Sequence, residues 1–309
     1  MYERALRGIG ILDLIRISCL RHTTRAFEGI VKKLEKRVYT CYNKCRIRHL
    51  SARSKPKKEP IMNNTHRFDG KSEIYAKARP KYAPELFVYL QNTLHIPAGS
   101  VFADIGSGTG IFTEQLLDCG YYVYAVEPGE DMRRKAEEKL SGNEHFTSVD
   151  GTASDTHLPD NSVDYITAAQ AFHWFDAEAF REECRRILKP GGKVVIAYNS
   201  RVPTAPCTMA LAEVHRTYNP EFHGFSNGMS HEKCTAFFAG GCDIFRADNT
   251  QTYDREGYIN RVLSSSYSMK ENDERYPKYL GILGALFDRF AKNGRLAVPM
   301  DTIAYSGEV

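Results

Sequence analysis

The sequence of 309 residues lacks several features that would assign it to a class at once. No stretch approaches the roughly 20 uninterrupted apolar residues that a membrane-spanning helix requires, because Asp13 and Arg16 interrupt the closest candidate, Ile9 to Ile17. The eight cysteines include no C-x-x-C pair and no small-domain spacing, so a disulfide framework is not indicated. We therefore expect a protein without a transmembrane segment in a reducing compartment, the cytoplasm.

Acidic residues are scarce at the start of the chain and abundant after it. Residues 1–61 contain 16 Lys and Arg against 5 Asp and Glu, a net charge of +11, whereas the remainder contains 26 against 33, a net charge of −7. Such asymmetry separates a tail from a folded domain. We expect a basic, poorly ordered extension over 1–61 and one domain over 62–309.

The basic extension leaves several interpretations open. A mitochondrial targeting segment, a membrane-surface helix and a nucleic-acid-binding arm each fit its charge, although Glu3 and Asp13 argue against targeting. Translation starting at Met62 is a further alternative. Cys41, Cys45 and His49 are spaced for one helix face, but three ligands without a fourth predict no metal site.

Strand and helix patterns alternate from Val101 onward. Short apolar runs predict strands at 101–105, 122–126, 146–149, 163–168 and 193–198, and helical patterns separate them at 109–119, 130–140 and 177–188. This alternation predicts an α/β fold with a Rossmann-like, mostly parallel, seven-stranded sheet and helices on both faces. A helix over 82–94 precedes this core of about 98–200. A cap inserted at about 200–241 and further strands near 243–247 and 296–305 follow it.

A glycine-rich turn at the end of the first predicted strand carries the most chemical information. It reads Asp104-Ile-Gly106-Ser-Gly108-Thr-Gly110, where glycines let a ligand approach the N–H groups at a helix start. Glu127 follows Gly106 by 21 residues, at the end of the next strand, where an acid can accept hydrogen bonds from ribose hydroxyls. The pattern indicates a small-molecule cradle, with a tight unliganded turn as the alternative.

The spacing of this turn disfavours two common nucleotide motifs. G-x-G-x-x-G would require glycine where Ile111 stands, and no Gly-Lys-Ser/Thr follows. Asp104 would be a poor neighbour for a pyrophosphate, but it suits a ligand that carries an ammonium and a sulfonium. A nicotinamide oxidoreductase is therefore the disfavoured alternative.

Further segments complete a series of motifs. Gly151-Thr152-Ala153-Ser154 precedes Leu158–Asp164, Gln170-Ala-Phe-His173-Trp174 follows a strand, and Leu188-Lys-Pro-Gly-Gly192 precedes the next. Together with the glycine turn and Val126-Glu127-Pro128, the series resembles the class I S-adenosylmethionine-dependent methyltransferases. Within them it is similar to the type 11 small-molecule group related to quinone-biosynthesis and trans-aconitate methyltransferases. The likeness runs from about residue 68 to 309.

The resemblance implies S-adenosyl-L-methionine as cofactor and assigns roles to named residues. The glycine turn would line the methionine part, Glu127 the ribose, and 151–154 the adenine. The family commonly has an acid where this chain has Thr152, so the backbone N–H of Ala153 is expected to serve there. The implied cofactor residues are Asp104, Gly106, Ser107, Gly108, Gly110, Glu127, Thr152, Ala153 and Gln170. The implied acceptor or lid residues are Tyr75, Arg79, Tyr82, His173 and Trp174, with His173 as the candidate general base.

The sequence also limits the methyl acceptor. The segment Gln170–Phe175 is not the Pro-Pro-Tyr-like turn of amino-directed DNA methyltransferases, and no two-glutamate loop of protein arginine methyltransferases follows that strand. The acidic domain makes nucleic acid an unlikely partner. We expect a small organic acceptor under the cap, with the aromatic residues Tyr218, Phe222, Phe225, Phe237 and Phe238 as candidate lining. A non-catalytic relative that uses its basic extension on RNA or membrane is the alternative.

Overall fold

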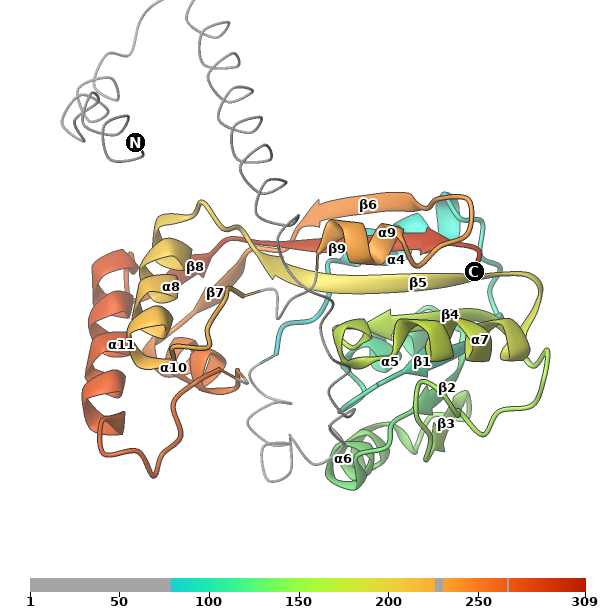
Figure 1. Cartoon of the computed structure of the whole chain (residues 1–309), viewed down its shortest axis with the longest axis horizontal. Coiled ribbons are helices and arrows are strands. Elements are labelled where there is room, and N and C mark those ends of the chain that lie inside the picture. Colours follow the sequence, from blue (N-terminus) through green and yellow to red (C-terminus); the bar gives the residue numbers. More distant parts are fainter. Residues whose placement is uncertain (1–78, 226–229, 266) are drawn as a thin grey trace, which may run out of the picture. The chain divides into compact units, whose positions relative to one another are not determined.

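The computed structural model describes residues 79–225, 230–265 and 267–309. The predictions for residues 1–61 and for Tyr75 lie outside these ranges. A seven-stranded sheet runs through the molecule in the order β3-β2-β1-β4-β5-β9-β6, and β9 alone is antiparallel to its neighbours (Figure 1). The strands are β1 (Val101–Ile105), β2 (Tyr122–Val126), β3 (Phe146–Val149), β4 (Val163–Ala169), β5 (Leu188–Arg201), β6 (Asp243–Asp248) and β9 (Met300–Gly307). The predicted Rossmann-like sheet is confirmed.

Helices cover both faces of this sheet. The helices α4 (Pro84–Asn92), α5 (Ile111–Asp118) and α6 (Glu130–Leu140) contribute to the apolar cluster on one face, and α7 (Ala177–Ile187) and α9 (His231–Thr235) to the cluster on the other. Strand residues alternate between the two faces, so Phe102 joins the first cluster and Ile105 the second. Within the described ranges, no helix is both long and apolar enough to cross a bilayer.

The turn predicted before the fifth strand is part of that strand. Helix α7 ends at Ile187 and β5 begins at the next residue, five residues earlier than expected. Val163 pairs with Leu188 and Tyr165 with Lys193, so the partner strand advances two residues while β5 advances five. Pro190-Gly-Gly therefore forms a bulge, and β5 pairs with β4 both before and after it. A Pro-Gly-Gly sequence would ordinarily predict a loop at this point.

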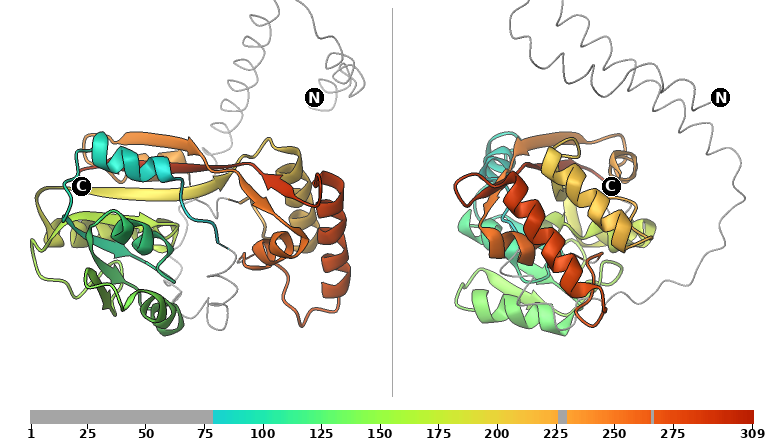
Figure 2. Two further views of the ribbon diagram at one scale, coloured as in Figure 1. Left: turned by 180° about the vertical axis from the view of Figure 1, so that it is seen from behind. Right: turned by 90° about the vertical axis from the view of Figure 1, so that its left-hand side faces the viewer.

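A second lobe grows from the carboxyl end of β5 and has its own apolar core (Figure 2). We call it the cap lobe. It comprises α8 (Pro206–Tyr218), β7 (Gln251–Tyr253), α10 (Arg255–Leu263), α11 (Tyr276–Phe290) and β8 (Leu296–Val298). Tyr258, Tyr279 and Leu283 are buried at its centre.

The expected cap range, 200–241, contains only one helix of this lobe. Cys234, Phe237 and Phe238 pack instead against Phe172 and Phe180 under the sheet. The two phenylalanines named as candidate acceptor lining are thus core residues. Periodicity shows that a segment has a buried face, but it does not show against which element that face packs.

Candidate cofactor and acceptor site

The glycine turn joins β1 to α5 with a backbone that only glycine adopts without strain. Gly106, Gly108 and Gly110 have φ angles of 67°, 58° and 76°. The N–H groups of Gly106 and Ser107 donate to the carbonyl of Val126 at 2.8 and 3.2 Å, which ties the turn to the end of β2. The turn is therefore fixed at the carboxyl edge of the sheet, where ligands of open α/β sheets bind.

The three glycines differ in what surrounds them. A Cβ on Gly106 would lie 2.7 Å from Cβ of Ala171, and one on Gly110 would lie 2.7 Å from Cδ1 of Leu140. These two positions are filled by the protein itself, which packs the turn against Ala171 and Phe175 at the two ends of η2 (Phe172–Trp174) and against α6. A Cβ on Gly108 would meet no atom of the described residues within 4 Å. Among the described residues, the space next to the middle glycine is therefore open.

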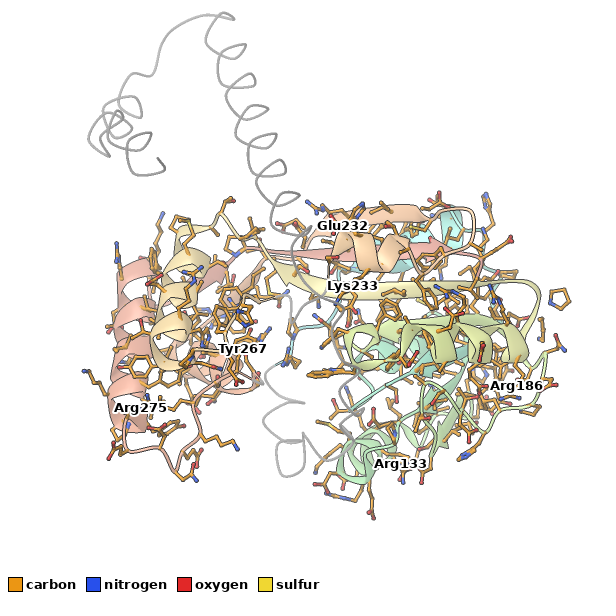
Figure 3. The ribbon with its side chains drawn as sticks, viewed as in Figure 1. Arg133, Arg186, Glu232, Lys233, Tyr267 and Arg275 are labelled. Atoms are coloured by element: carbon orange, nitrogen blue, oxygen red, sulfur yellow. The ribbon has the colours of Figure 1, made fainter. Side chains whose placement is uncertain are left out.

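Glu127 lies beside the turn and is held by it. Its Oε2 accepts from the N–H of Gly108 at 2.9 Å, and its Oε1 accepts from the N–H of Gly129 at 2.9 Å. Burial raises the pKa of Glu127, and these two N–H bonds and Arg133 oppose that rise. Arg133 donates to the Glu127 carbonyl at 2.8 Å and to Asp150 at 3.2 Å (Figure 3). Both carboxylate oxygens and the backbone carbonyl of Glu127 are thus held by hydrogen bonds within the protein, without a ligand.

Asp104 is placed below the turn. Its side chain has no exposed surface, and its two oxygens accept from Thr113 at 2.7 Å and Thr167 at 2.8 Å. Burial raises its pKa to about 6, although the two threonine hydroxyls act in the opposite direction. Asp104 therefore links β1, α5 and β4 under the site. Its predicted contact with the ammonium stays a prediction, because every hydrogen bond of the carboxylate in the structure is internal.

The segment expected to hold the adenine ring is anchored from below. Thr152 and Asp155 close a tight loop through an N–H···O bond of 2.8 Å. The next residue, Thr156, donates both its N–H and its hydroxyl to Glu183 of α7, at 2.8 and 2.5 Å. Burial would raise the pKa of Glu183, but the bonds from Arg186 and Thr156 outweigh it and lower the pKa to about 2. Thr152 itself is exposed and Ala153 half-buried, as an open binding edge requires.

Arg186 completes this anchor (Figure 3). It donates to both oxygens of Glu183, at 2.7 and 2.8 Å, and to the carbonyl of Leu158 at 2.8 Å. An ion pair with Asp160 at 2.7 Å holds the far end of the loop. No sequence pattern marks these roles, since Glu183 and Arg186 look like ordinary charges on an amphipathic helix.

Gln170 lies directly after β4 and holds the next strand. Its φ of 56° is unusual for a residue with a side chain, and its Nε2 donates to the carbonyl of Asn199 in β5 at 2.8 Å. Asn199 in turn donates to the carbonyl of Lys81 at 3.2 Å, and its Oδ1 accepts from Thr302 at 2.6 Å and from Asn249 at 2.9 Å. The polar side chains at this edge thus form one connected network.

The same network fixes the segment that precedes α4. Thr302 accepts from the N–H of Ala83 at 3.0 Å, and Asn249 donates to the carbonyl of Lys81 at 2.9 Å. Gln115 bonds both the N–H and the carbonyl of Tyr82, at 2.9 and 3.0 Å. Residues 80–83 are therefore held along the carboxyl edge of the sheet. Sequence reasoning missed these polar partners because they lie 33 to 219 residues from the segment they bind.

The predicted acceptor-side residues fall into different environments. The Tyr82 ring is buried against Phe112 at 4.8 Å and belongs to the core. Arg79 reaches the cap lobe, where its Nη2 donates to the carbonyl of Ser264 at 3.1 Å. His173 and Trp174 are half-buried in η2, with ring centroids 4.5 Å apart, and the His173 ring lies 6.1 Å from Tyr198. The roles of His173 as base and of Tyr82 toward the acceptor stay predictions.

The residues around the turn fit S-adenosylmethionine. The hydroxyls of Ser107 and Thr109 are buried without a hydrogen-bond partner among the described residues, and a buried polar atom of this kind ordinarily finds one. Above Gly108 the space is open, and Glu127 offers a carboxylate next to it. These groups match a ligand with a polar methionine end and a ribose diol.

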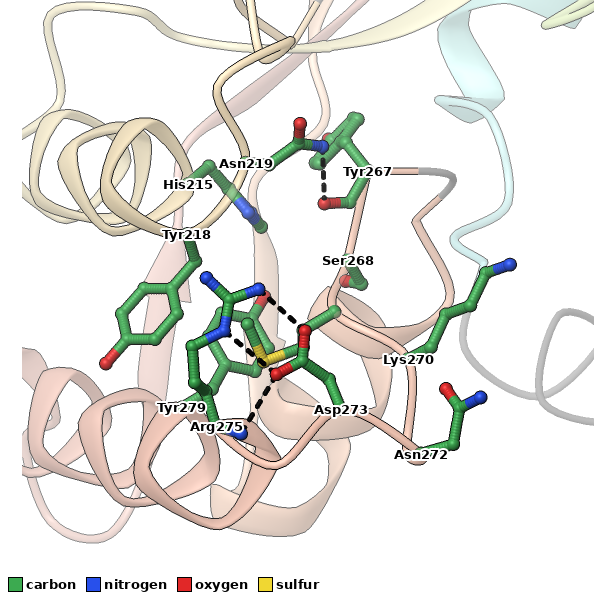
Figure 4. Close-up of a pocket in the computed structure, with 11 residues that line it drawn as sticks. His215, Tyr218, Asn219, Tyr267, Ser268, Lys270, Asn272, Asp273, Arg275 and Tyr279 are labelled. Atoms are coloured by element: carbon green, nitrogen blue, oxygen red, sulfur yellow. Dashed lines mark hydrogen bonds and ion pairs between the residues drawn. The ribbon is translucent and has the colours of Figure 1, made fainter.

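A hollow lies in the cap lobe, and none of the residues that line it belongs to the glycine turn. It has a volume of about 400 Å³ and is bounded by the end of α8, the segment 267–275 and the start of α11 (Figure 4). The Arg275 side chain at its wall is paired with Asp273 through bonds of 2.6 and 2.9 Å. His215 forms the inner wall, where burial, with a smaller effect of Arg201, lowers its pKa to about 3.

Comparisons with known proteins agree with this geometry. Residues 103–196 match the model of a family described as a methyltransferase domain. An uncharacterized methyltransferase of Mycobacterium tuberculosis is 36% identical over 141 residues, which are 45% of this chain and 55% of that protein. An uncharacterized methyltransferase-like protein of Schizosaccharomyces pombe is 30% identical over 155 residues, 49% of this chain and 58% of that protein. The chain thus spans a little over half the length of these relatives.

Solved structures share the fold. A protein of Anaeromyxobacter dehalogenans, provisionally described as a type II methyltransferase, superposes with a TM-score of 0.58 at 23% identity and covers 74% of this chain and 97% of that one. A protein of Anabaena variabilis, provisionally described as a methyltransferase of an antibiotic pathway, superposes with a TM-score of 0.53 at 21% identity. This match covers 74% of this chain and 98% of that one. The narrower likeness to quinone-biosynthesis and trans-aconitate enzymes stays a prediction. Residues 103–196 thus form a methyltransferase domain with the class I, S-adenosylmethionine-dependent fold, and S-adenosylmethionine is the cofactor of that family.

Proposed function

We propose that this protein transfers a methyl group from S-adenosylmethionine to a small organic acceptor held between the carboxyl edge of the sheet and the cap lobe. The observation that carries the proposal is the pairing of the open Gly108 position with Glu127, whose Oε2 accepts from the Gly108 N–H at 2.9 Å. The matched methyltransferase domain, residues 103–196, contains both residues.

Each group of the site then has a binding or orienting task. Bound S-adenosylmethionine supplies a methyl group that its sulfonium already activates. The turn from Gly106 to Gly110 positions the methionine part, and Glu127 accepts hydrogen bonds from the ribose. The loop at Thr152 and Ala153 bounds the adenine, and Gln170 holds the ends of β4 and β5 together at the reacting edge. Alignment of the partners and exclusion of water are the main contributions that such a transfer needs from a protein.

The acceptor side is formed by less regular elements. His173 and Trp174 follow β4, and Arg79 reaches from the segment before α4 to the cap lobe. An acceptor atom that must lose a proton would have His173 as the candidate base, since imidazole exchanges a proton near neutral pH. The small size of the acceptor is inferred from the net charge of −7 after residue 61 and the absence of nucleic-acid motifs.

Calorimetry with S-adenosylhomocysteine tests the proposal directly. We expect the full chain to bind this product in the micromolar range, and absence of binding up to about 1 mM would contradict the proposal. Incubation with methyl-labelled S-adenosylmethionine and fractions of a metabolite extract then identifies the acceptor. Cofactor binding without label transfer to any fraction would favour the non-catalytic alternative.

A further inference from the structure

A buried arginine in the cap lobe lacks the partners that such a group needs. Arg261 lies on α10 with 5% of its surface exposed. Its Nε and Nη1 are buried and have no hydrogen-bond partner among the residues that the structure describes. Lone buried charges are costly, and proteins ordinarily pair them or hydrogen-bond them. The guanidinium therefore presents two unused donors inside the lobe.

The charged groups nearest to Arg261 are also positive. Burial and the nearby charges of Arg79 and Arg201 lower its pKa to about 9, and only Tyr253 and Tyr267 act in the opposite direction. In the described part of the chain, no carboxylate forms an ion pair with Arg201 or Arg261. Arg261 and Arg201 thus lie near each other without a carboxylate partner among the described residues, and Arg79 adds a third positive charge nearby.

These arginines come from three separate elements that meet next to the proposed reaction site. Arg201 is the last residue of β5, two residues after Asn199, which Gln170 holds. Arg79 precedes the segment along the sheet edge and reaches the Ser264 carbonyl at the end of α10. Figures 1 and 2 show α10 on the side of the cap lobe that lies nearest the sheet.

The remaining surroundings suit a planar or tetrahedral oxyanion. The guanidinium of Arg201 lies 5.3 Å from the centre of the Phe225 ring, which holds it in place without neutralising it. The Tyr253 hydroxyl is buried and also has no partner in the described residues. Arginine forks match the oxygens of carboxylates and phosphates.

We propose that Arg261, supported by Arg201 and Arg79, binds a carboxylate or phosphate group of the methyl acceptor, so that the substrate of this enzyme is a small acid. This rests on the proposed methyltransferase function, and it adds the substrate's chemical class. The rest of the acceptor would then extend from the anion toward His173 and the cofactor methyl group. The acid is recognised by the cap lobe, while the sheet binds the cofactor.

The test uses the full chain saturated with S-adenosylhomocysteine. Malonate, succinate and inorganic phosphate are titrated by calorimetry, and malonamide and succinamide serve as uncharged matches. We expect at least one of the acids to bind and the diamides not to bind. The Arg261→Met variant should weaken acid binding by roughly 30-fold or more, because an anion would lose its buried partner. Preference for phosphate over both dicarboxylates would identify the phosphate form of the acceptor.

Two readouts separate the outcomes. In Arg261→Met, affinity for S-adenosylhomocysteine should be unchanged and the midpoint of thermal unfolding should rise by roughly 2 to 10 °C, because an unpaired buried charge is removed. Arg216→Met, an exposed arginine of α8 paired with Glu213 at 2.7 Å, is the matched control and should change none of these values.

Several results would overturn the inference. If neither the dicarboxylates nor phosphate bind to the saturated wild type, or if Arg261→Met binds them equally well, the arginines do not recognise the acceptor. If the variant instead loses affinity for S-adenosylhomocysteine, the arginines serve the cofactor's own carboxylate. Failure of the wild type to bind S-adenosylhomocysteine would contradict the proposed function itself, so the two failures are distinguishable.

Discussion

The sheet and the cap lobe treat buried charge in opposite ways. Under the sheet the buried groups are acids, and their oxygens are satisfied: Asp104 accepts from two threonines and Glu127 from two backbone N–H groups. In the cap lobe the buried groups are basic, and Arg261 and His215 retain nitrogens without partners among the described residues. The acidic side suits a cofactor that carries positive charge, and the basic side suits an acceptor that carries negative charge.

This contrast separates what is complete from what waits for a ligand. The hydrogen bonds around Glu127 and Glu183 are closed within the protein, so these carboxylates of the proposed cofactor side are preorganised, whereas the buried hydroxyls of Ser107 and Thr109 have no partner among the described residues. The donors of Arg261 are open, and the free energy of burying them is recovered only when an anion arrives.

The largest effect is expected in the cap lobe at acid pH. The pKa of His215 falls from an ordinary 6.5 to about 3 because of burial, so the unfolded chain binds this proton first as pH decreases. Stability that is present above pH 6.5 should therefore be lost toward pH 3, by about 5 kcal/mol from this one group. Unfolding by urea across pH 3 to 7 measures the slope.

The variant His215→Phe keeps an aromatic ring beside Phe222 and removes the titration. Its free energy of unfolding should depend less on pH over this interval, whereas substitution of the exposed His223 by Gln should leave the wild-type slope in place. Equal slopes in the wild type and His215→Phe would show that His215 is not buried in its neutral form.

On the cofactor side, Gly106→Ala should have the next largest effect. The new methyl group would meet Cβ of Ala171 at 2.7 Å, and the φ of 67° disfavours any side chain. We expect a loss of roughly 4 kcal/mol of unfolding free energy from overpacking and backbone strain, together with weakened cofactor binding. Denaturant unfolding and calorimetry measure the two effects.

Gly99→Ala is the matched control for that substitution. Its φ is also positive, at 77°, but a Cβ there would meet no described atom within 4 Å. Gly99→Ala should lose stability through backbone strain alone, without a steric clash, and should keep full cofactor affinity. Equal losses in the two variants would mean that backbone conformation alone, and not the packing of the turn against Ala171, sets the requirement for glycine.

Asp104 should show the opposite pH dependence to His215. Its pKa rises from 3.8 to about 6 in the folded state, so the folded protein holds the proton over this interval. Stability from this group is therefore greatest below pH 3.8 and declines by about 3 kcal/mol as pH rises to 6. Asp104→Asn should abolish this decline in urea unfolding, and Asp118→Asn on the surface should not. If the unfolding free energy of Asp104→Asn depended on pH as in the wild type, Asp104 would not be the group responsible for the decline.

Glu127→Ala should give the smallest effect of the four. Loss of the carboxylate removes charge-assisted hydrogen bonds to the ribose and should weaken S-adenosylhomocysteine binding by roughly 1 to 3 kcal/mol. Glu127→Gln should retain part of the affinity because the amide oxygen still accepts. Glu144→Ala, at a side chain that is 94% exposed, should have no effect. Unchanged affinity in Glu127→Ala would exclude its ribose contact.

The sequence by itself determined the sheet and the glycine turn with Glu127 beside it. Alternating strand and helix patterns and the spacing from Gly106 to Glu127 are local signals, because a βαβ unit forms from neighbouring residues in order. The expected segments 101–105, 122–126 and 146–149 coincide with β1, β2 and β3.

Only the tertiary structure decided the cap lobe and the arginines of the proposed acceptor side. The cap lobe brings α8 together with 251–298, and Arg79, Arg201 and Arg261 meet from positions up to 182 residues apart. No local pattern marks these arginines, since each alone looks like a solvated charge. The role proposed for Arg261 comes from its burial and from its nitrogens without partners among the described residues, and both are properties of the packed chain. The physical reason is that backbone patterns act over a few residues, whereas desolvation depends on everything that folds around a group.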